Sequence, residues 1–238
     1  MAITATNLTG NTNATTLQSY DTASIFPGAN KLILASVNIR NYNAVDLGTI
    51  SLSGNGLTWV EVDTRIYSTL ADSKSRLSIF RAMGASPTSG VVTITISGTS
   101  NAHCSWSVEE YDGIDTSGTN GSGAIVQTAF DITDNNSGDP LAVTLAALTG
   151  NNAVHASFGY DDGGAIVAGT GYTQLTSVGS GSNFLLTEYK VPGTTTPTES
   201  GSPSFTDAAG IGVEIKEASA GGGVVIPVFM KHYKGLRV

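Results

Sequence analysis

The chain has 238 residues, of which 40% are hydrophobic and 13% are charged, and its formal net charge at pH 7 is −8. This length suits one large all-β domain or two small ones, and the hydrophobic share is enough for a core. Charged residues have about half of their usual ~25% share, and with 29 glycines the composition predicts short strands, tight turns and almost no helix.

The charges are distributed unevenly along the chain. Between Arg81 and Lys190 there is no Lys or Arg, whereas ten acidic residues lie in that interval. After Glu217 there is no acid, and the last eight residues contain three cations, Lys231, Lys234 and Arg237. An acidic body repels nucleic acid, and three cations bind it only weakly. We therefore expect no nucleic-acid partner and a tail that contacts protein.

The sequence contains no recognisable targeting or disulfide signal. MAITATNLTG lacks a basic region and an apolar stretch, so we expect no signal peptide there, and no run approaches membrane-spanning length. Cys104 is the only cysteine and alternates with Trp106 and Val108, which predicts a buried structural thiol. A composition like that of extracellular proteins without an export signal fits a virion protein, made in a host cytoplasm and released by lysis. Secretion without a signal also fits.

The first half of the chain reads as a series of short strands. Residues 1–15 are polar and low in complexity, and we expect an N-terminal arm or an irregular first strand there. From Val60 the apolar side chains alternate with polar ones, the period of a half-buried strand, with Val60, Val62 and Ile66 on one face and Glu61, Asp63 and Arg65 on the other. The strands predicted in this half are 16–24, 32–40, 49–53, 60–67, 77–80, 91–97 and 103–111.

The second half continues the same pattern. After a turn-rich connection at residues 112–123, we expect strands at 124–131, 141–148, 153–160, 172–178, 183–191 and 210–217. The halves look related, since Ala35-Ser36 aligns with Ala156-Ser157 and Gly56 aligns with Gly171. The prediction is an all-β jelly roll or β-sandwich of about a dozen antiparallel strands in residues 16–217, with halves 16–115 and 124–217. One jelly roll is favoured over two domains, because the connection is short and one half is small for a two-sheet core.

Several motifs resemble those of a known group of proteins. Gly54–Trp59 precedes an alternating strand, Tyr111–Asp115 has the form YxGxD, and the second half carries Gly171-Tyr172-Thr173 and Glu188–Val191. The chain resembles a diffuse group of β-sandwich proteins found in bacteriophage structural modules, prophages and bacterial surface proteins. The resemblance covers roughly residues 32–217 and implies a fold and a setting, without site residues.

After Glu217 the character of the sequence changes. Residues 218–238 comprise a glycine hinge followed by VVIPVFMKHYKGLRV, in which Pro227 interrupts an apolar run. An apolar segment beyond a hinge needs a cover, and strand addition to a neighbouring subunit supplies one. The alternative is that the tail folds back on its own body. The residues predicted to bind a partner are Val224, Val225, Ile226, Val228, Phe229, Met230, Lys231, Tyr233, Lys234 and Arg237.

No catalytic or metal signature emerges from the remaining polar residues. Glu109 and Glu110 are consecutive on a strand and face opposite ways. Glu61 and Asp63 have the spacing of an inverting glycosidase pair, but Arg65 beside them indicates a solvated face. Residues 131–139 and Asp161-Asp162 supply oxygens for calcium but fail the EF-hand spacing. The three histidines lack ligand-spaced partners, so we expect no catalytic residues, no metal and no cofactor.

The leading interpretation is a non-enzymatic virion structural protein: a capsid decoration, fibre or tail component. Its partners would be other virion proteins or copies of itself in a homo-oligomer, of which a trimer is one form, with no membrane. The alternative is a carbohydrate-binding adhesin module, for which Trp59, Tyr67, Tyr160 and Tyr172 could supply a glycan platform. A glycan-active enzyme is the third hypothesis and requires two convergent acids in a cleft.

Overall fold

The protein is a stack of antiparallel β-sheets. The computed structural model describes residues 2–41, 47–68, 74–98, 103–133, 141–161, 166–201 and 207–219, which include a single three-residue 3₁₀-helix, Ser122–Ala124. The all-β class is therefore confirmed. The strands in these residues are β1 (Thr4–Asn13), β2 (Ser19–Asp21), β3 (Leu32–Asn41), β4 (Ile50–Gly54), β5 (Val60–Tyr67), β6 (Lys74–Ala82), β7 (Val92–Ile96), β8 (His103–Asp112), β9 (Ile125–Thr133), β10 (Ala153–Asp161), β11 (Ile166–Val167), β12 (Thr173–Ser180), β13 (Asn183–Lys190), β14 (Ser200–Gly201) and β15 (Ala208–Ile215).

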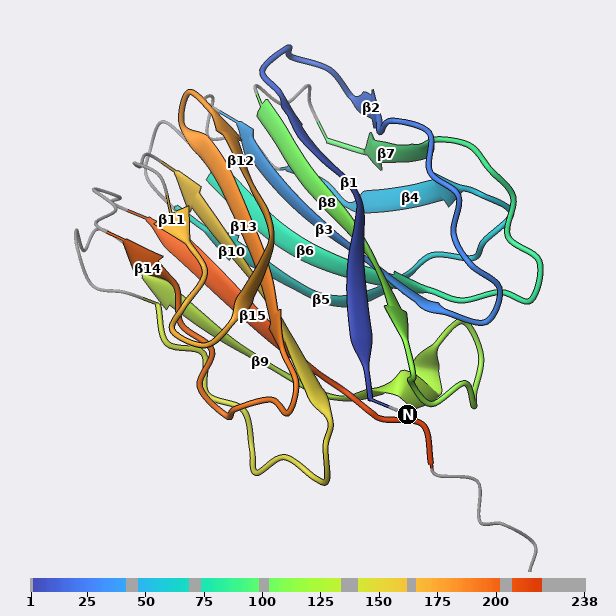
Figure 1. The fold of residues 1–238 in the computed structure, drawn as a ribbon. Coiled ribbons are helices and arrows are strands. Elements are labelled where there is room, and N and C mark those ends of the chain that lie inside the picture. Colours follow the sequence, from blue (N-terminus) through green and yellow to red (C-terminus); the bar gives the residue numbers. More distant parts are fainter. Residues whose placement is uncertain are drawn as a thin grey trace, which may run out of the picture.

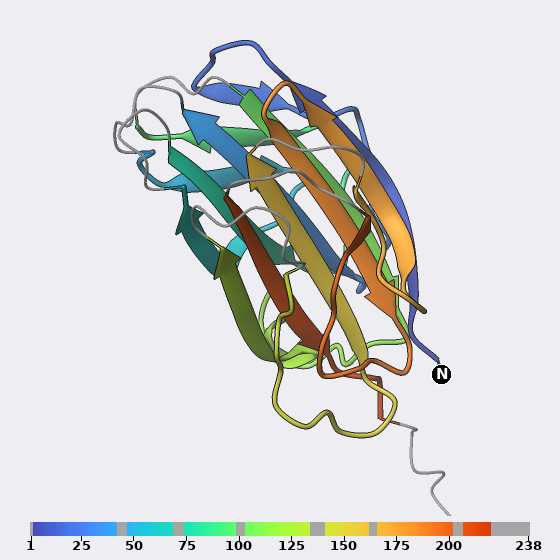
Figure 2. The same ribbon diagram turned by 90° about the vertical axis from the view of Figure 1, so that its left-hand side faces the viewer.

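Two five-stranded sheets form the centre of the stack (Figure 1). The first sheet has the strand order β1-β8-β3-β6-β5, and the second sheet has the order β12-β13-β10-β15-β9. A small sheet, β2-β7-β4, covers the outer face of the first sheet, and β11 with β14 lies over the outer face of the second (Figures 1 and 2). The arrangement is a sandwich whose two outer faces are themselves covered.

Both five-stranded sheets have the same internal order. The strands of the first sheet, ranked along the chain, are β1, β3, β5, β6 and β8, and those of the second are β9, β10, β12, β13 and β15. Read from β1 and from β9, each sheet has the ranks 1-5-2-4-3. A repeat in the sequence would produce this relation. Thr4–Asn13, within the segment expected as an arm or an irregular first strand, supplies the edge of the first sheet.

The strand order does not confirm the jelly roll. The two sheets of a jelly roll draw their strands from both halves of the chain, because consecutive strands pass from one sheet to the other. Here all strands of the first sheet precede residue 113, and all strands of the second follow residue 124. Each half therefore closes its own sheet, and the core between the sheets is the contact between the halves.

Three apolar clusters hold the layers together. The first lies between the two five-stranded sheets and includes Leu34, Ile79 and Ile211. The second joins the first sheet to the small sheet, and the third joins the second sheet to the segment around Val143. All ten residues of β3 are buried, because apolar layers cover both of its faces. Each fully buried Leu, Ile or Val side chain contributes about 1.5–3 kcal/mol to the stability of the stack.

Strands were predicted more reliably than the faces of their side chains. The segment 60–67 forms β5, but a register shift between Glu61 and Asp63 interrupts its alternation. As a result Ile66, expected inside with Val62, is 44% exposed. The predicted strand 141–148 forms only one isolated bridge, between Ala142 and Thr198, among the residues described.

Candidate functional site

The predicted attachment segment begins where the described body ends. All ten predicted partner-binding residues lie in 224–238, outside the described residues, which end at Ser219. Just before that end the chain is fixed to the body: Lys216 Nζ lies 2.6 Å from Asp115 Oδ2, and the backbone N–H of Ala218 donates to the carbonyl of Gly113 at 2.9 Å. The point at which the tail leaves the sandwich is therefore defined.

The ion pair at this exit persists in acid. Hydrogen bonds from the Lys216 ammonium and from Ser117 lower the pKa of Asp115 to about 2. The carboxylate therefore stays ionised through the range in which most carboxyls are protonated. The backbone N–H of Lys216 also donates to the carbonyl of Ala124 at 2.9 Å, which places the exit beside the first residue of β9.

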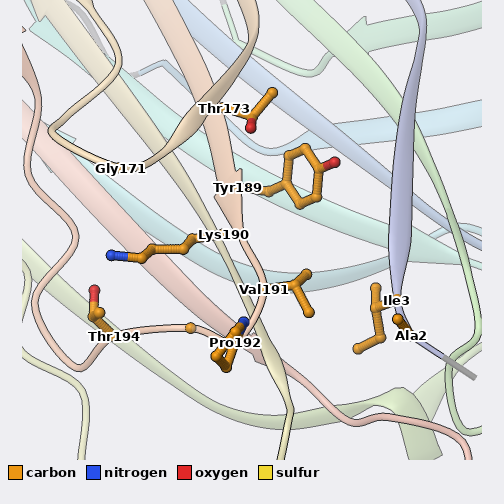
Figure 3. A pocket seen from close by; sticks show the side chains of 10 residues that line it. Ala2, Ile3, Gly171, Thr173, Tyr189, Lys190, Val191, Pro192 and Thr194 are labelled. Carbon is orange, nitrogen blue, oxygen red and sulfur yellow. The ribbon is translucent and has the colours of Figure 1, made fainter.

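A groove of about 540 Å³ opens at the same end of the sandwich, between the start of β1, the start of β12 and the end of β13 (Figure 3). One side is apolar and is continuous with the core between the sheets, since Ile3, Tyr189 and Val191 belong to that cluster. Figure 3 shows Lys190 on the other side, near Thr194. The groove is lined by Ala2, Ile3, Gly171, Thr173, Tyr189, Lys190, Val191, Pro192, Gly193 and Thr194.

The charge in this groove is positive. Lys190 Nζ lies 5.3 Å from the centre of the Tyr172 ring, whose hydroxyl shares a 2.7 Å hydrogen bond with Thr194 Oγ1. Lys190 forms no salt bridge with any residue that the structure describes. The groove can therefore bind an anionic group, whereas it repels a cationic segment such as the tail.

A second surface lies on the long flank where β5 and β9 are the edges of their sheets. A cleft of about 320 Å³ opens there between Val62 and Ile125. On β9 the side chains of Val126, Phe130 and Ile132 are 46%, 47% and 37% exposed. We refer to these three residues, with Thr128 between them, as the β9 edge.

The β9 edge is held rigidly from both sides. The guanidinium of Arg65 lies 3.4 Å from the centre of the Phe130 ring, and Asp63 Oδ1 holds Arg65 Nη2 at 2.8 Å. The polar residues that alternate with the exposed ones face the outer layer: Gln127 exchanges two hydrogen bonds with the backbone of Ala146, and Asp131 Oδ2 accepts one from Ala142. The sequence predicted a strand here but gave no signal that its apolar face would remain exposed.

The carboxylates considered for glycosidase chemistry do not converge. In β5, Glu61 pairs with Phe80 and Asp63 with Ile79, and these two β6 residues belong to different core clusters. Asp63 is engaged by Arg65. Glu109 and Glu110 face opposite ways, as predicted: Glu109 is buried between the sheets, whereas Glu110 Oε1 pairs with Lys31 at 3.1 Å.

The loops considered for calcium are only partly described. Residues 134–140 and Asp162 lie outside the described residues. Asp161 contacts Arg40 at 3.5 Å, an interaction that a cation would replace. Within the described part of the chain, no group of three or more His, Cys, Asp or Glu side chains is arranged to hold a metal ion.

The four aromatic residues considered for a glycan platform lie apart. Tyr67 is 1% exposed in the core between the sheets, and its hydroxyl donates to Asn38 Oδ1 at 2.8 Å. Tyr160 is 1% exposed in the cluster on the other face of the second sheet, and Trp59 packs against the small-sheet cluster. These four rings therefore do not form one platform, because Tyr67 and Tyr160 face different interior layers.

A buried polar layer, which the sequence did not predict, lies between the two sheets. It contains residues that alternate with the apolar ones of β3, β8, β10 and β13, and we call it the polar seam: Ser36, Asn38, Ser105, Ser107, Glu109, Tyr111, His155, Ser157, Asn183 and Thr187. Asn38 Nδ2 donates to Asn183 Oδ1 at 2.6 Å, and Ser36 and Ser157 share a hydrogen bond of 2.6 Å between sheets. The available signal was the alternation of Ser36 and Asn38 with Val37 and Ile39 inside a strand predicted to be buried.

Glu109 and His155 are the carboxyl and the imidazole of this seam. Burial raises the pKa of Glu109 to about 7, although hydrogen bonds from Ser107 and Thr187 lower it. Burial lowers the pKa of His155 to about 3. Because both side chains are inaccessible, these shifts concern stability and the contact between halves, rather than a reaction with a substrate.

Comparisons with known proteins add no assignment: no family model, no curated protein and no solved structure matches the chain. Among the described residues, no helix is long and apolar enough to cross a membrane.

Proposed function

We propose that this chain is a non-enzymatic structural protein of a phage particle, attached to its neighbours through Val224–Val238. The observation that carries the proposal is the contrast between the anchored exit at Lys216–Ala218 and the apolar, cationic segment that follows it. The particle component would be a capsid decoration, a fibre or a tail component, and in each case the work of the protein would be adhesion between subunits. The location would then be the virion.

The architecture of the body supports a mechanical role. Three apolar clusters and the polar seam connect successive layers, so the sheets cannot slide without breaking buried hydrogen bonds. The proposal also includes a relationship to the phage β-sandwich proteins that the chain resembles. It further includes the descent of the two sheets from one repeated half. A rigid body with a separate attachment segment suits a subunit that occurs in many copies.

The charges support attachment to an acidic neighbour. Residues 218–238 carry three cations and no acid, a net +3, and the remaining 8 Lys and Arg against 19 Asp and Glu leave residues 1–217 at −11. Opposite potentials steer two surfaces together and fix their orientation, while the apolar side chains supply the buried area. The body of a second copy is one such neighbour.

Deletion of Val224–Val238 tests the proposal in cells that produce the particle. The expected result is a chain with the circular dichroism spectrum and melting temperature of the wild type that is absent from purified particles. A matched control replaces Lys231, Lys234 and Arg237 by Ser and keeps the apolar run. This variant should be incorporated weakly, and its incorporation should depend less on salt concentration than that of the wild type. Normal incorporation of the deletion variant would overturn the attachment role.

A further inference from the structure

The two long flanks of the sandwich are closed to different extents. Where β1 and β12 meet, Asn7 Nδ2 donates to Thr176 Oγ1 at 2.6 Å, and Gly10 is so close that a Cβ atom there would lie 2.7 Å from Thr176 Cγ2. Where β5 and β9 meet, the sheets leave a cleft of about 320 Å³. A neighbouring chain can therefore approach a strand edge at β9.

The β9 edge has the properties of a strand acceptor. β9 pairs with β15 along one side, and its other side takes part in no ladder within the described residues. Phe130 and Ile132, two residues apart, present half-exposed apolar side chains on one face. Unpaired edges with exposed apolar side chains are templates for another strand, and native proteins normally cover or charge them.

We propose that the β9 edge accepts the apolar segment Val224–Met230 of a second copy of this chain as an added antiparallel strand. The inference rests on the proposed function, since it names the surface that receives the attachment segment. Main-chain hydrogen bonds would supply affinity, and contacts with Phe130 and Ile132 would set the register. Two copies related by a two-fold axis would each donate a segment and accept one.

The position of the exit explains why the donor comes from another copy. The chain leaves the body beside the start of β9, because the N–H of Lys216 donates to the carbonyl of Ala124. From Ser219 to Val224 is five residues, which span at most about 17 Å. β9 has nine residues and is about 30 Å long, and an antiparallel partner must enter at its far end. The chain's own segment therefore reaches only the parallel orientation, which is less stable per residue.

The chemistry of the segment fits this surface better than it fits the groove of Figure 3. The groove presents Lys190, which repels the cations that follow the apolar run, whereas Arg65 beside Phe130 at the β9 edge is paired with Asp63. The body as a whole carries −11, so a second body attracts the segment at long range. Pro227 lacks an N–H, and an added strand is an edge strand, where proline is tolerated.

Disulfide trapping between two full-length variants tests the inference. Thr128→Cys places a thiol on the β9 edge, Val228→Cys places one in the donor segment, and the buried Cys104 does not compete. The two variants are mixed under oxidised glutathione, and non-reducing electrophoresis with mass spectrometry identifies the linked peptides. The expected product is a mixed dimer that links the two substituted positions, reduced at least tenfold when Phe130→Asp and Ile132→Asp are added to the T128C chain.

The control uses an exposed residue elsewhere. Val167 in β11 is 47% exposed, as is Phe130, so Val167→Cys mixed with V228C measures random collision. Equal trapping of the control, absence of the mixed dimer, or an intramolecular bond in the T128C/V228C double variant would each overturn the inference. If trapping fails while the tail deletion still loses incorporation into particles, the attachment function stands and its acceptor lies elsewhere. If the deletion incorporates normally, the proposed function itself is wrong.

Discussion

The hydroxyl of Tyr111 in β8 lies 2.8 Å from Nδ1 of His155 in β10, so one hydrogen bond joins the two five-stranded sheets at the polar seam. The rings meet edge to face, with centroids 6.0 Å apart. Nε2 of the same imidazole lies 2.8 Å from Ser157 Oγ. Both ring nitrogens are thus engaged in a side chain that is fully buried, and neutral imidazole is the form that this environment favours.

His155 and Glu109 give stability opposite dependences on pH. The pKa of His155 is about 3 in the fold against 6.5 for a free side chain. The contribution of His155 to the free energy of unfolding is therefore complete above pH 6.5 and is lost as the pH falls toward 3. The pKa of Glu109 is about 7 against 4.5, so its contribution is complete below pH 4.5 and is lost as the pH rises through 7.

Glu109→Gln should remove the loss of stability that ionisation of Glu109 causes as the pH rises. The pKa difference from 4.5 to about 7 corresponds to about 3 kcal/mol, so the variant should gain that much over the wild type between pH 4.5 and pH 8. Its carbonyl can still accept the hydrogen bond from Thr187. Urea unfolding at both pH values measures the gain. Val167→Ala, at an exposed and uncharged position of β11, is the control and should keep the pH dependence of the wild type; parallel behaviour of the two variants would contradict the assignment.

Both faces of β3 should contribute equally to stability. Leu34→Ala opens a cavity between the five-stranded sheets, and Ile39→Ala opens one beneath the small sheet. Each should lower the free energy of unfolding by about 2–5 kcal/mol, the usual cost of such truncations. Val167→Ala, at an exposed position, should change it by at most about 0.5 kcal/mol. A loss under about 1 kcal/mol for Ile39→Ala would mean that the small sheet is a loose cover.

The thiol of Cys104 should be inert in the folded protein. Cys104 is fully buried in the cluster beneath the small sheet, and burial raises its pKa well above the ordinary value, so the reactive thiolate is scarce. A colorimetric thiol reagent should therefore react only after unfolding in urea, and then with one thiol per chain. Rapid labelling under native conditions would show that the small sheet opens, and the fluorescence of Trp59 and Trp106, which both pack in that cluster, would report the opening independently.

Much of the local structure could be predicted from the sequence. The alternation of Val92, Ile94 and Ile96 and the buried run beginning at Leu32 correspond to observed strands, because a period of two is a local property of the chain. The buried thiol at Cys104 and the divergence of Glu109 and Glu110 follow from the same periodicity. In each case the prediction depended only on neighbours in sequence.

The candidate surfaces could not be predicted in this way. Val126, Phe130 and Ile132 have the same apolar character as residues of a buried face, and they remain exposed only because β9 is the last strand of its sheet. The polar seam likewise exists because Ser36, Asn38 and their neighbours face polar residues that lie more than a hundred positions away. Periodicity along the chain determined which side chains share a face of a strand. Which faces meet, which strand is left at an edge, and where the tail leaves the body were decided by contacts distant in sequence, and local spacing carries no information about those.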